Sequence, residues 1–476
     1  MIERTLEQMT DMLGDERVQV SWASTPRDIP IIGISTDTRT IRPGSLFVPL
    51  IGDHYDGHAY AAEAYSKGAA AALWQDDHPH PPEGMPIIRV KDTLTALQQL
   101  AKSYRKQLPV RIIGITGSNG KTTTKDLVAA VLGSTFQVHK TKGNLNNHIG
   151  LPLTLLELEE TTQFAVVEMG MSGRGEIDLL SHLAEPEASI ITMIGESHML
   201  QLGSREEIAR AKAEIVSGMP SGGLFVYNGD EPLIEQALAE RSLDGQAAES
   251  PTSLPEGLRR IRFGSGADND LFPTDIRMDA DGAYFQINST GYPELFIPLL
   301  GTHNVINALA AIAIGEAFGV SPEGITAGLR SLQMTSMRIE KLTAASGLTV
   351  LNDAYNASPA SMRAAIDLTE QLRGFGRKFL VLGDMLELGE HEEQFHRGIG
   401  RVLSPERVDY VFTFGRLGRF IADEAAQQFP KACVRAFDDK EQLAAELAAI
   451  AQAEDLVLVK GSRGMRLEQV VNALLA

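Results

Sequence analysis

The sequence contains very little cysteine: Cys433 is the only one among 476 residues. No intramolecular disulfide and no cysteine-based zinc site can therefore form. Long apolar runs are also missing, since the run at residues 308–314 is too short to span a bilayer and Glu316 soon follows it. The first residues, Met1 to Arg4, mix charged with apolar side chains and lack the apolar segment of a signal peptide. We therefore expect a cytoplasmic protein without membrane insertion.

Positive charge is scarce as well, with 43 Lys and Arg against 62 Asp and Glu and a net charge of −19. A chain without a basic surplus is poorly suited to neutralise the phosphates of nucleic acid or of an anionic membrane, so we expect neither partner. Apolar residues make up 43% of the chain and charged residues 22%, as in ordinary globular proteins. A length of 476 residues exceeds what one core usually serves and favours three domains.

Apolar runs and turn signals divide the chain into three blocks, at residues 1–108, 109–334 and 335–476. The first block is predicted to be a small α/β domain. Its segment His78-Pro79-His80-Pro81-Pro82 has the composition of a surface loop, most simply a connector.

The second and third blocks alternate short apolar runs with helical segments, a pattern typical of mostly parallel sheets covered on both faces. The expected strands are 112–116, 164–168, 189–194 and 224–227 in the second block, and 348–351, 379–382, 410–414 and 456–459 in the third. We predict an α/β fold with a central, mostly parallel domain and a C-terminal, doubly wound, Rossmann-like domain.

The most informative segment is Gly117-Ser118-Asn119-Gly120-Lys121-Thr122-Thr123, which lies between the strand 112–116 and a helix expected at 125–132. Its glycines allow backbone N–H groups to converge on phosphate oxygens at a helix N-terminus. Lys121 would then reach the terminal phosphates of a nucleoside triphosphate, and Thr122 would hold Mg²⁺. The usual phosphate-loop pattern has glycine where this chain has Ile115, so the alternative is a glycine-rich turn that merely precedes Lys-Thr.

Candidate magnesium ligands follow two further strands of the central block. Glu168 closes the strand 164–168, and His198 follows the strand 189–194. Parallel strands of one sheet end at the same edge, where a carboxylate near the phosphate loop is well placed to bind Mg²⁺. A capping acid or a structural histidine is the alternative for each.

A lysine lies on the apolar face of the next predicted helix. Ser204 and Glu207 have the spacing of a capping box at its start. The stripe that follows consists of Ile208, Ala211, Ile215 and Val216. Lys212 belongs to this stripe, where an ammonium group is costly unless it is neutralised or paired. A snorkelling lysine, whose stem packs while its amine reaches water, is the simpler alternative from spacing alone.

Two polar clusters complete the candidate site. Residues 301–308 carry His303, Asn304 and Asn307, whose side chains suit hydrogen bonding to and stacking on a purine. Asp353 follows the first strand of the third block and is placed to accept ribose hydroxyls. Ordinary capping chemistry is the alternative for both clusters.

In this order the motifs resemble the Mur ligase family, the ATP-dependent amide ligases of peptidoglycan precursor synthesis. The resemblance extends over essentially the whole chain. It is carried by the phosphate loop, Gly143-Asn144-Leu145-Asn146-Asn147, Val167-Glu168-Met169-Gly170, Gly195-Glu196-Ser197-His198, Ala211-Lys212-Ala213-Glu214-Ile215, His303-Asn304 through Asn307, and Asn352-Asp353-Ala354-Tyr355-Asn356-Ala357. Segments 47–58, 383–389 and 460–468 are most similar to the members that add D-alanyl-D-alanine, with Tyr55 in a phenylalanine position. Ser336 and Ser358 replace the family's usual proline and asparagine.

The resemblance implies a reaction and its participants. ATP phosphorylates the terminal carboxylate of UDP-N-acetylmuramoyl-tripeptide, and the amine of D-alanyl-D-alanine then displaces phosphate to form an amide. The implied cofactor is Mg²⁺, as two ions. The implied catalytic residues are Lys121, Glu168, His198 and Lys212, and the implied metal ligands are Thr122, Glu168, His198 and Lys212, the last as a carbamate.

The binding residues follow from the same resemblance. For ATP they are Thr116, Gly117, Ser118, Asn119, Gly120, Lys121, Thr122, Thr123, Asn304, Asn307, Arg338 and Asp353. For the UDP-linked substrate they are Ser35, Thr38, Arg39, Asp53, Asp56, Gly57, His58, Asn144 and Asn146.

Two alternatives stay open at this point. Another Mur-type ligase, MurE-like or folylpolyglutamate synthase-like, would share the phosphate loop and the carbamylated lysine but is expected to lack the Asp-Gly-His segment of the first block. A non-catalytic ATP-binding module would need no set of metal ligands. We expect a monomer whose adenosine contacts, phosphate loop and UDP contacts fall in three different blocks, so that the domains must converge.

Overall fold

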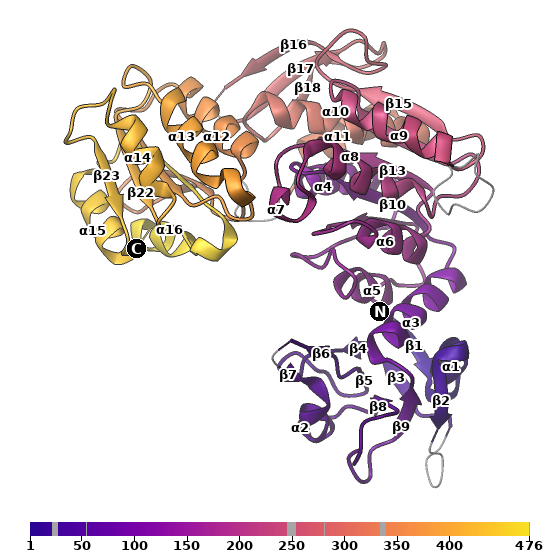
Figure 1. The fold of residues 1–476 in the computed structure, drawn as a ribbon. Coiled ribbons are helices and arrows are strands. Elements are labelled where there is room, and N and C mark those ends of the chain that lie inside the picture. The colour runs from indigo at the N-terminus through magenta and orange to yellow at the C-terminus, as the bar shows by residue number, and fades with distance from the viewer. Residues whose placement is uncertain (21–26, 54, 245–253, 280, 334–338, 476) are drawn as a thin grey trace.

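The computed structural model describes residues 1–20, 27–53, 55–244, 254–279, 281–333 and 339–475. The chain forms three α/β domains in sequence order, and the central one joins the other two (Figure 1). In the view of Figure 1 the N-terminal domain lies at the bottom and the C-terminal domain at the upper left, on different sides of the central domain.

The N-terminal domain contains a five-stranded sheet in the order β2-β9-β8-β5-β4. Its strands are β2 (Arg17–Val20), β4 (Ile34–Ser35), β5 (Leu46–Phe47), β8 (Ala71–Gln75) and β9 (Ile87–Val90), and all but β2 run parallel. Two small antiparallel pairs join β1 (Glu3–Thr5) to β3 (Pro30–Ile32) and β6 (Ile51–Gly52) to β7 (Tyr55–Asp56). The helices are α1 (Leu6–Met12), η1 (Gly14–Glu16), η2 (Gly57–Tyr60), α2 (Ala61–Ser66) and α3 (Thr93–Gln107).

The central domain is built on a six-stranded, entirely parallel sheet in the order β11-β12-β10-β13-β14-β15. Its strands are β10 (Arg111–Thr116), β11 (Val138–Lys140), β12 (Phe164–Glu168), β13 (Ala188–Ile191), β14 (Leu224–Asn228) and β15 (Arg259–Phe263). A three-stranded antiparallel sheet follows, made of β16 (Pro273–Met278), β17 (Ala283–Ile287) and β18 (Leu295–Ile297). The helices are α4 (Lys121–Gly133), α5 (Gly150–Leu156), α6 (Glu176–Ala184), α7 (Met199–Leu202), α8 (Arg205–Ala213), η3 (Glu214–Val216), α9 (Pro232–Asp244), α10 (Thr302–Ala317) and α11 (Pro322–Arg330).

The C-terminal domain has a second six-stranded sheet, in the order β19-β20-β24-β21-β22-β23. Its strands are β19 (Glu340–Thr343), β20 (Thr349–Asp353), β21 (Lys378–Gly383), β22 (Tyr410–Phe414), β23 (Val434–Phe437) and β24 (Leu456–Lys460), and only β19 is antiparallel. The helices are α12 (Pro359–Gln371), η4 (Gly389–His391), α13 (Glu392–Val402), α14 (Gly418–Ala425), α15 (Lys440–Ile450), η5 (Arg463–Met465) and α16 (Glu468–Leu475). The predicted α/β fold class is confirmed.

The expected strands of the two larger domains are all present, and 164–168 and 410–414 match β12 and β22 residue for residue. Most other strand ends differ from the prediction by one or two residues, and three boundaries differ in a way that matters for the site. Helix α4 begins at Lys121 and not at residue 125, because the glycine-rich loop leads directly into the first helical turn. Strand β13 ends at Ile191, short of the predicted 194. Helix α8 ends at Ala213, so that Ile215 and Val216 continue the buried stripe from the short η3 turn.

Helix α3 joins the first two domains. Its buried residues belong to one continuous core that reaches from α1 in the N-terminal domain to α5 and α6 in the central domain. The hydroxyl of Tyr104 donates a hydrogen bond to the carbonyl of Leu158 at 2.8 Å, and Arg105 Nε donates to the carbonyl of Ala184 at 2.9 Å. No helix among the described residues is long and apolar enough to cross a membrane.

Candidate functional site

The phosphate loop lies between β10 and α4, in the middle of the central sheet. Gly117 and Gly120 both adopt positive φ, which glycine tolerates without steric cost. A Cβ at Gly117 would lie 1.9 Å from Thr192 Oγ1, and a Cβ at Gly120 would lie 2.8 Å from Asn307 Oδ1. Glycine therefore suits the backbone conformation at both positions, and at Gly117 the neighbouring Thr192 also leaves no room for a side chain. The predicted strand–loop–helix arrangement is present, although Ile115 occupies a usual glycine position.

The ends of the two strands beside β10 carry the predicted metal ligands. Strand β12 pairs with one side of β10 and β13 with the other, so Glu168 and His198 follow neighbouring strands at the same edge as the loop. Glu168, His198 and Lys212 line one pocket together with Lys121. The sequence-based expectation that these four residues come together describes their arrangement correctly.

Glu168 is held in place by its neighbours. It is 2% exposed, and its Oε2 accepts a hydrogen bond from Asn146 Nδ2 at 3.4 Å. The buried ammonium of Lys125 lies 3.5 Å from Glu168 Oε1 and donates to the carbonyl of Thr141 at 3.0 Å. Among the described residues, Glu168 Oε1 accepts no hydrogen bond. Lys125 was not predicted, because its place beside Glu168 depends on how α4 packs against β12.

His198 occupies the N-cap of α7 in a left-handed backbone conformation, with φ of 68°. Burial is the main cause that lowers the pKa of His198 below its ordinary value, and the positive charge of Lys121 adds to the effect. The imidazole is therefore neutral at physiological pH, which is the form that binds metal. Its Nδ1 lies 3.0 Å from Glu387 Oε2 of the C-terminal domain.

Lys212 lies on α8 and is 2% exposed. Complete burial, reinforced by the charge of Lys121, lowers the pKa of Lys212 well below its ordinary value. In the part of the chain that the structure describes, no carboxylate forms an ion pair with Lys212. The snorkelling alternative is therefore wrong: the amine is as buried as the stem. At the start of α8, Ser204 accepts a hydrogen bond from the Glu207 N–H, but the Glu207 carboxylate pairs with Arg210 and Arg174 and leaves the capping box incomplete.

Residues of the phosphate loop also line a second cleft. Six of the residues predicted to bind ATP line it, namely Asn119, Gly120, Thr123, Asn304, Asn307 and Asp353. Asn304 and Asn307 lie on α10, which packs against α4. The expectation that Asn304 and Asn307 lie in a different block from the phosphate loop is wrong, because α10 returns to the central sheet. Of the cleft residues named above, only Asp353 belongs to the C-terminal domain.

Other residues of this cleft were not assigned a role from the sequence. Lys460, at the end of β24, is buried, forms an ion pair with Asp353 and donates to the carbonyl of Asn356 at 3.0 Å. Thr192, Asn228 and Asp230 also line this cleft. A polar residue at a strand end is the signal that could have identified Lys460 and Asn228. Arg338 lies outside the described residues.

The remaining predicted residues lie in the central domain or in the N-terminal domain. Thr116, Ser118 and Thr122 are buried around the phosphate loop, and Asn144 and Asn146 line the pocket of Glu168. The other seven lie in the N-terminal domain, at or after the carboxyl ends of β4 and β5: Ser35, Thr38, Arg39, Asp53, Asp56, Gly57 and His58. Ligands of α/β sheets bind at such an edge.

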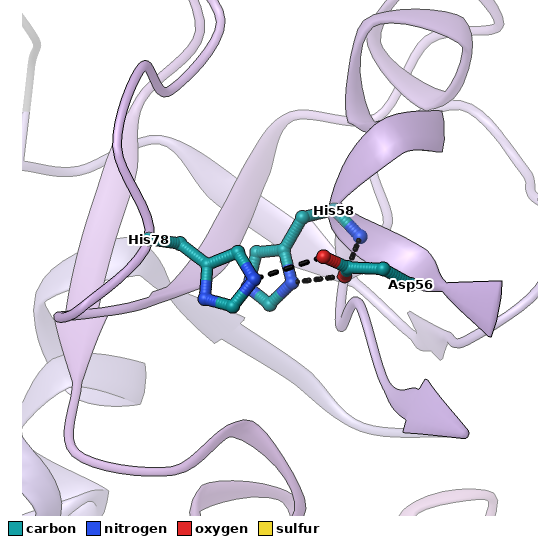
Figure 2. Close-up of side chains that lie close together, drawn as sticks. All are labelled: Asp56, His58 and His78. Atoms are coloured by element: carbon teal, nitrogen blue, oxygen red, sulfur yellow. Dashed lines mark hydrogen bonds and ion pairs between the residues drawn. The ribbon is translucent and has the colours of Figure 1, made fainter. Parts of the chain in front are cut away.

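The N-terminal residues are tied down by local contacts. The Arg39 guanidinium forms an ion pair with Asp37 at 2.6 Å, and its hydrogen bonds hold the pKa of Asp37 at about 2. Gly57 leaves no room for a side chain, since a Cβ would lie 2.7 Å from the backbone of Leu50. Asp56 and His58 form a cluster with His78, shown in Figure 2. The loop that carries His78 is therefore more than the connector we predicted.

Family models match most of the chain in three segments. They are described as Mur ligase family, catalytic domain, at residues 30–105; Mur ligase middle domain, at 115–315; and Mur ligase, glutamate ligase domain, at 337–463.

Full-length relatives support the same family assignment. The UDP-N-acetylmuramoyl-tripeptide–D-alanyl-D-alanine ligase of Bacillus subtilis is 49% identical over 475 residues, covering 100% of this chain and 99% of the relative. The Escherichia coli enzyme of the same name is 35% identical over 480 residues, with coverage of 100% and 99%. A crystal structure of MurF from Acinetobacter baumannii superposes with a TM-score of 0.86 at 30% identity, covering 100% of this chain and 99% of that one. The chain therefore belongs to the Mur ligase family, as a ligase of the MurF type.

Proposed function

We propose that this chain joins D-alanyl-D-alanine to UDP-N-acetylmuramoyl-tripeptide and converts ATP to ADP and phosphate. The observation that carries the proposal is the pocket in which Lys121 of the phosphate loop faces Glu168, His198 and Lys212. An ATP-binding module without catalysis has no use for this set of groups. Support for the substrates comes from the full-length likeness to ligases named for them, and support for the nucleotide from the MurF ligase of Thermotoga maritima solved with ADP, at 26% identity and a TM-score of 0.78, with coverage of 93% of this chain and 96% of that one.

The reaction requires an activated carboxyl group, because a carboxylate is a poor electrophile. The tripeptide carboxylate attacks the γ-phosphorus of ATP, and the bond to ADP breaks to give an acyl phosphate. The amine of D-alanyl-D-alanine then adds to the acyl carbon and loses a proton. The resulting tetrahedral intermediate expels phosphate and leaves an amide.

The protein's part in phosphoryl transfer is mainly positioning and charge neutralisation. The N–H groups of the loop and of the first turn of α4 face the phosphates, and Lys121 neutralises the charge that develops on the transferred group. Asp353, fixed by Lys460, is placed to accept the ribose hydroxyls. Asn304 and Asn307 lie where the purine would be held.

The pocket also has the donors for the magnesium that we assign to this enzyme. Glu168 offers a buried oxygen that accepts no hydrogen bond from the described residues, and His198 offers a neutral imidazole. Thr122, Glu168, His198 and a carbamylated Lys212 would hold two ions. Bound Mg²⁺ would neutralise phosphate charge during transfer.

Carbamylation is the fate of Lys212 that best suits its surroundings. The neutral amine adds to the carbon of CO₂ and releases a proton, leaving a carbamate whose oxygens are hard ligands. Burial favours the neutral amine that this step requires, and the residue has no carboxylate partner among the described residues. We propose this modification for Lys212, and we also propose that the enzyme is a cytoplasmic monomer.

The test is phosphate release from ATP and Mg²⁺ in the presence of D-alanyl-D-alanine and UDP-N-acetylmuramoyl-tripeptide. Two tripeptides are supplied separately, one ending in meso-diaminopimelate and one in L-lysine. We expect phosphate release only when all substrates are present, with one tripeptide preferred, and a product that carries the added dipeptide. No turnover with either tripeptide would contradict the proposed function.

A further inference from the structure

The cluster of Asp56, His58 and His78 joins two loops at one edge of the N-terminal sheet (Figure 2). Asp56 ends β7, and His58 follows in η2. His78 comes from the loop after β8. Strands β5 and β8 are adjacent and parallel, so the chain segments that follow them leave the sheet at the same edge. This is the edge at which we place the UDP-linked substrate.

The hydrogen bonds of His58 fix its tautomer. Its Nε2 accepts from the backbone N–H of Gln75 at 3.2 Å, so the proton of the neutral ring is on Nδ1. Nδ1 lies 2.7 Å from Asp56 Oδ1 and donates to it. Burial lowers the pKa of His58, although the hydrogen bond that it donates to Asp56 acts to raise the pKa. His58 is therefore a neutral donor to Asp56.

His78 faces a carboxylate on each side. Its Nε2 lies 2.8 Å from Asp56 Oδ2, and its Nδ1 lies 3.1 Å from Asp77 Oδ1. Both ring nitrogens can donate at once only in the imidazolium form. The hydrogen bond to Asp77 raises the pKa of His78, and Asp56 adds to this effect against partial burial. The ring of His78 stacks on that of His58 with centroids 4.1 Å apart.

Asp56 thus accepts three hydrogen bonds, from the backbone N–H and Nδ1 of His58 and from Nε2 of His78. Burial acts to raise the pKa of Asp56, but the hydrogen bonds from His58 and His78 outweigh it and hold the pKa at about 2. Because Asp56 ends the β6–β7 hairpin, fixing its carboxylate also fixes the hairpin that carries Asp53.

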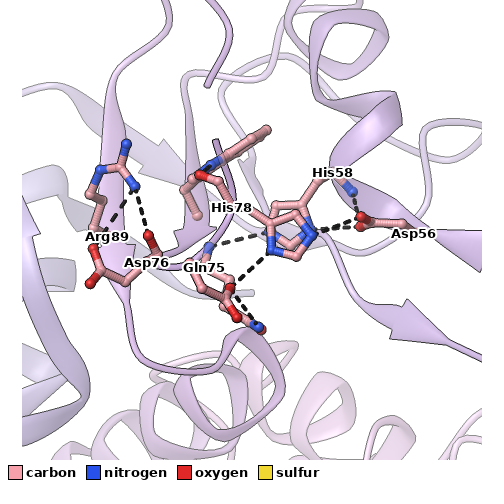
Figure 3. A network of polar contacts seen from close by, with 8 residues as sticks. Asp56, His58, Gln75, Asp76, His78 and Arg89 are labelled. Carbon is pink, nitrogen blue, oxygen red and sulfur yellow. Dashed lines mark hydrogen bonds and ion pairs between the residues drawn. The ribbon is translucent and has the colours of Figure 1, made fainter. Parts of the chain in front are cut away.

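We propose that His78 is a positioning residue for the UDP-linked substrate, which as an imidazolium clamps Asp56 and so fixes the turn Asp56-Gly57-His58 at the substrate edge. This inference rests on the proposed function. Figure 3 shows the polar network around the clamp, in which Asp76 lies beside Arg89 and Gln75 holds His58. Among the described residues, the charged or titratable groups that face His78 are Asp56, Asp77 and His58.

A metal centre made of the same three side chains is the competing interpretation, since their ligand atoms lie within 4.8 Å of one another. It conflicts with the tautomer of His58. A ligating Nδ1 would leave the proton of a neutral ring on Nε2, but that atom accepts a hydrogen bond from Gln75. The two stacked rings also direct their nitrogens to different oxygens of Asp56, and not to one point.

The experiment measures the dissociation constant of UDP-N-acetylmuramoyl-tripeptide by calorimetry for the full-length wild type, His78→Ala, His78→Gln and the control His80→Asn. His80 is an exposed residue of the same loop with positive φ, a conformation that Asn tolerates. We expect His78→Ala to weaken binding about tenfold, the size of one charge-assisted hydrogen bond. His80→Asn should bind like the wild type, and ATP affinity should be unchanged in all variants.

The pH profile separates a charged clamp from general stabilisation. The pKa of His78 in the folded protein is raised above the ordinary value of histidine. The clamp is therefore complete below that ordinary pKa and is lost as the pH rises through the folded-state pKa of His78. The affinity of the wild type for UDP-N-acetylmuramoyl-tripeptide should therefore fall as the pH rises through the folded-state pKa of His78. His78→Gln keeps a neutral donor near Nε2, so its binding should be intermediate and should not follow this transition.

Three outcomes would overturn the inference. Unchanged affinity in His78→Ala with a lower melting temperature would make the residue merely structural. An identical pH profile in wild type and His78→Gln would exclude the imidazolium. Stoichiometric Zn²⁺ retained by the wild type after dialysis, and lost in His78→Ala, would establish the metal centre. Failure of the wild type to bind the UDP-linked tripeptide would instead contradict the proposed function.

Discussion

At the scale of single residues, the surroundings of each buried lysine determine what it can do. Lys125 faces Asp126 and Glu168, and Lys460 faces Asp353, so both buried ammonium groups are neutralised by carboxylates. Lys212 is equally buried but has no such partner among the described residues. A buried ammonium without a counter-charge is unfavourable, and the lysine is expected to shed its proton. This contrast separates the lysine that can react with CO₂ from the two that hold carboxylates.

We predict that Lys212→Ala lowers turnover at least about 100-fold, as expected when a preorganised charge at the transferred phosphate is lost. The melting temperature should fall little, because alanine suits the helix and the stripe around it stays apolar. Added acetate should restore part of the activity by placing a carboxylate in the vacated space. The control variant is Lys106→Ala, which replaces an exposed lysine. Its turnover should match that of the wild type and should not change when acetate is added. Full turnover of Lys212→Ala would refute the carbamate.

We also predict that Lys121→Ala removes most ligase activity, roughly 100-fold or more, and leaves the fold intact. The developing charge on the transferred phosphate would lose its neutralising partner. Single-turnover measurement of ADP formation gives the rate of phosphoryl transfer, and circular dichroism reports the fold. A variant that forms ADP at the wild-type rate would show that Gly-Lys-Thr is not the phosphate cradle.

Prediction from the sequence succeeded for residues whose position follows from strand order. Glu168 and His198 end or follow apolar strands, and neighbouring parallel strands place such residues at one edge. It failed for His78 and Lys125, whose roles depend on which loop or helix packs beside them. The buried state of Lys212 needed the structure, since helical spacing alone favours a snorkelling side chain.

At the scale of secondary-structure elements, burial decided which strands the sequence revealed. Strands β12 and β24 are buried along their whole length, and each is a run of four apolar residues that ends in one charged residue. Strand β16 alternates exposed with partly buried residues and resembles a loop in sequence, so the antiparallel sheet β16–β18 was not predicted. Strands β4 and β5 have two residues each, too few to show any period.

Helix α8 offers a test at this scale, because it carries Lys212 and begins at Ser204. We predict that Ser204→Ala costs about 1 kcal/mol of unfolding free energy, the usual value of an N-cap side chain. Ser204→Asp should retain the cap and the stability. The measurement is chemical denaturation of each variant, with activity recorded in parallel.

The incomplete capping box makes Glu207→Ala the informative control for this helix. The Glu207 carboxylate pairs with Arg210 and Arg174 and not with the Ser204 N–H. Partly exposed ion pairs of this kind contribute little, so Glu207→Ala should cost less than Ser204→Ala. A larger cost for Glu207→Ala would mean that the reciprocal hydrogen bond of a capping box forms in solution.

At the scale of the whole molecule, the two proposed domain boundaries have different characters. The boundary at 108/109 follows α3, whose core is shared with the central domain, so the first two domains pack as neighbours. The boundary at 334/335 falls outside the described residues. The central and C-terminal domains meet through a few polar contacts, among them Ser358 Oγ to Asn119 Oδ1 at 3.2 Å and His198 Nδ1 to Glu387 Oε2 at 3.0 Å.

Those two contacts link the phosphate loop and a proposed metal ligand to the C-terminal domain, so substrates that bind at either place act on the same interface. The UDP-linked substrate adds a third attachment at the edge of the N-terminal sheet, which Figure 1 places on another side of the central domain. The UDP-linked substrate spans two domains, and the nucleotide holds the third. Together they favour a compact arrangement of the domains, because only in that arrangement are the contacts to all three domains made at the same time.

We therefore predict that the radius of gyration measured by solution X-ray scattering falls when a non-hydrolysable ATP analogue and the UDP-linked tripeptide are both bound. Each ligand alone should give a smaller decrease, since each bridges fewer domains. Lys121→Ala should weaken the response to nucleotide but not the response to the UDP-linked substrate, which identifies the phosphate loop as the point of nucleotide-driven closure. Identical scattering curves for the free and doubly bound enzyme would mean that the domains are already in their catalytic arrangement before substrates bind.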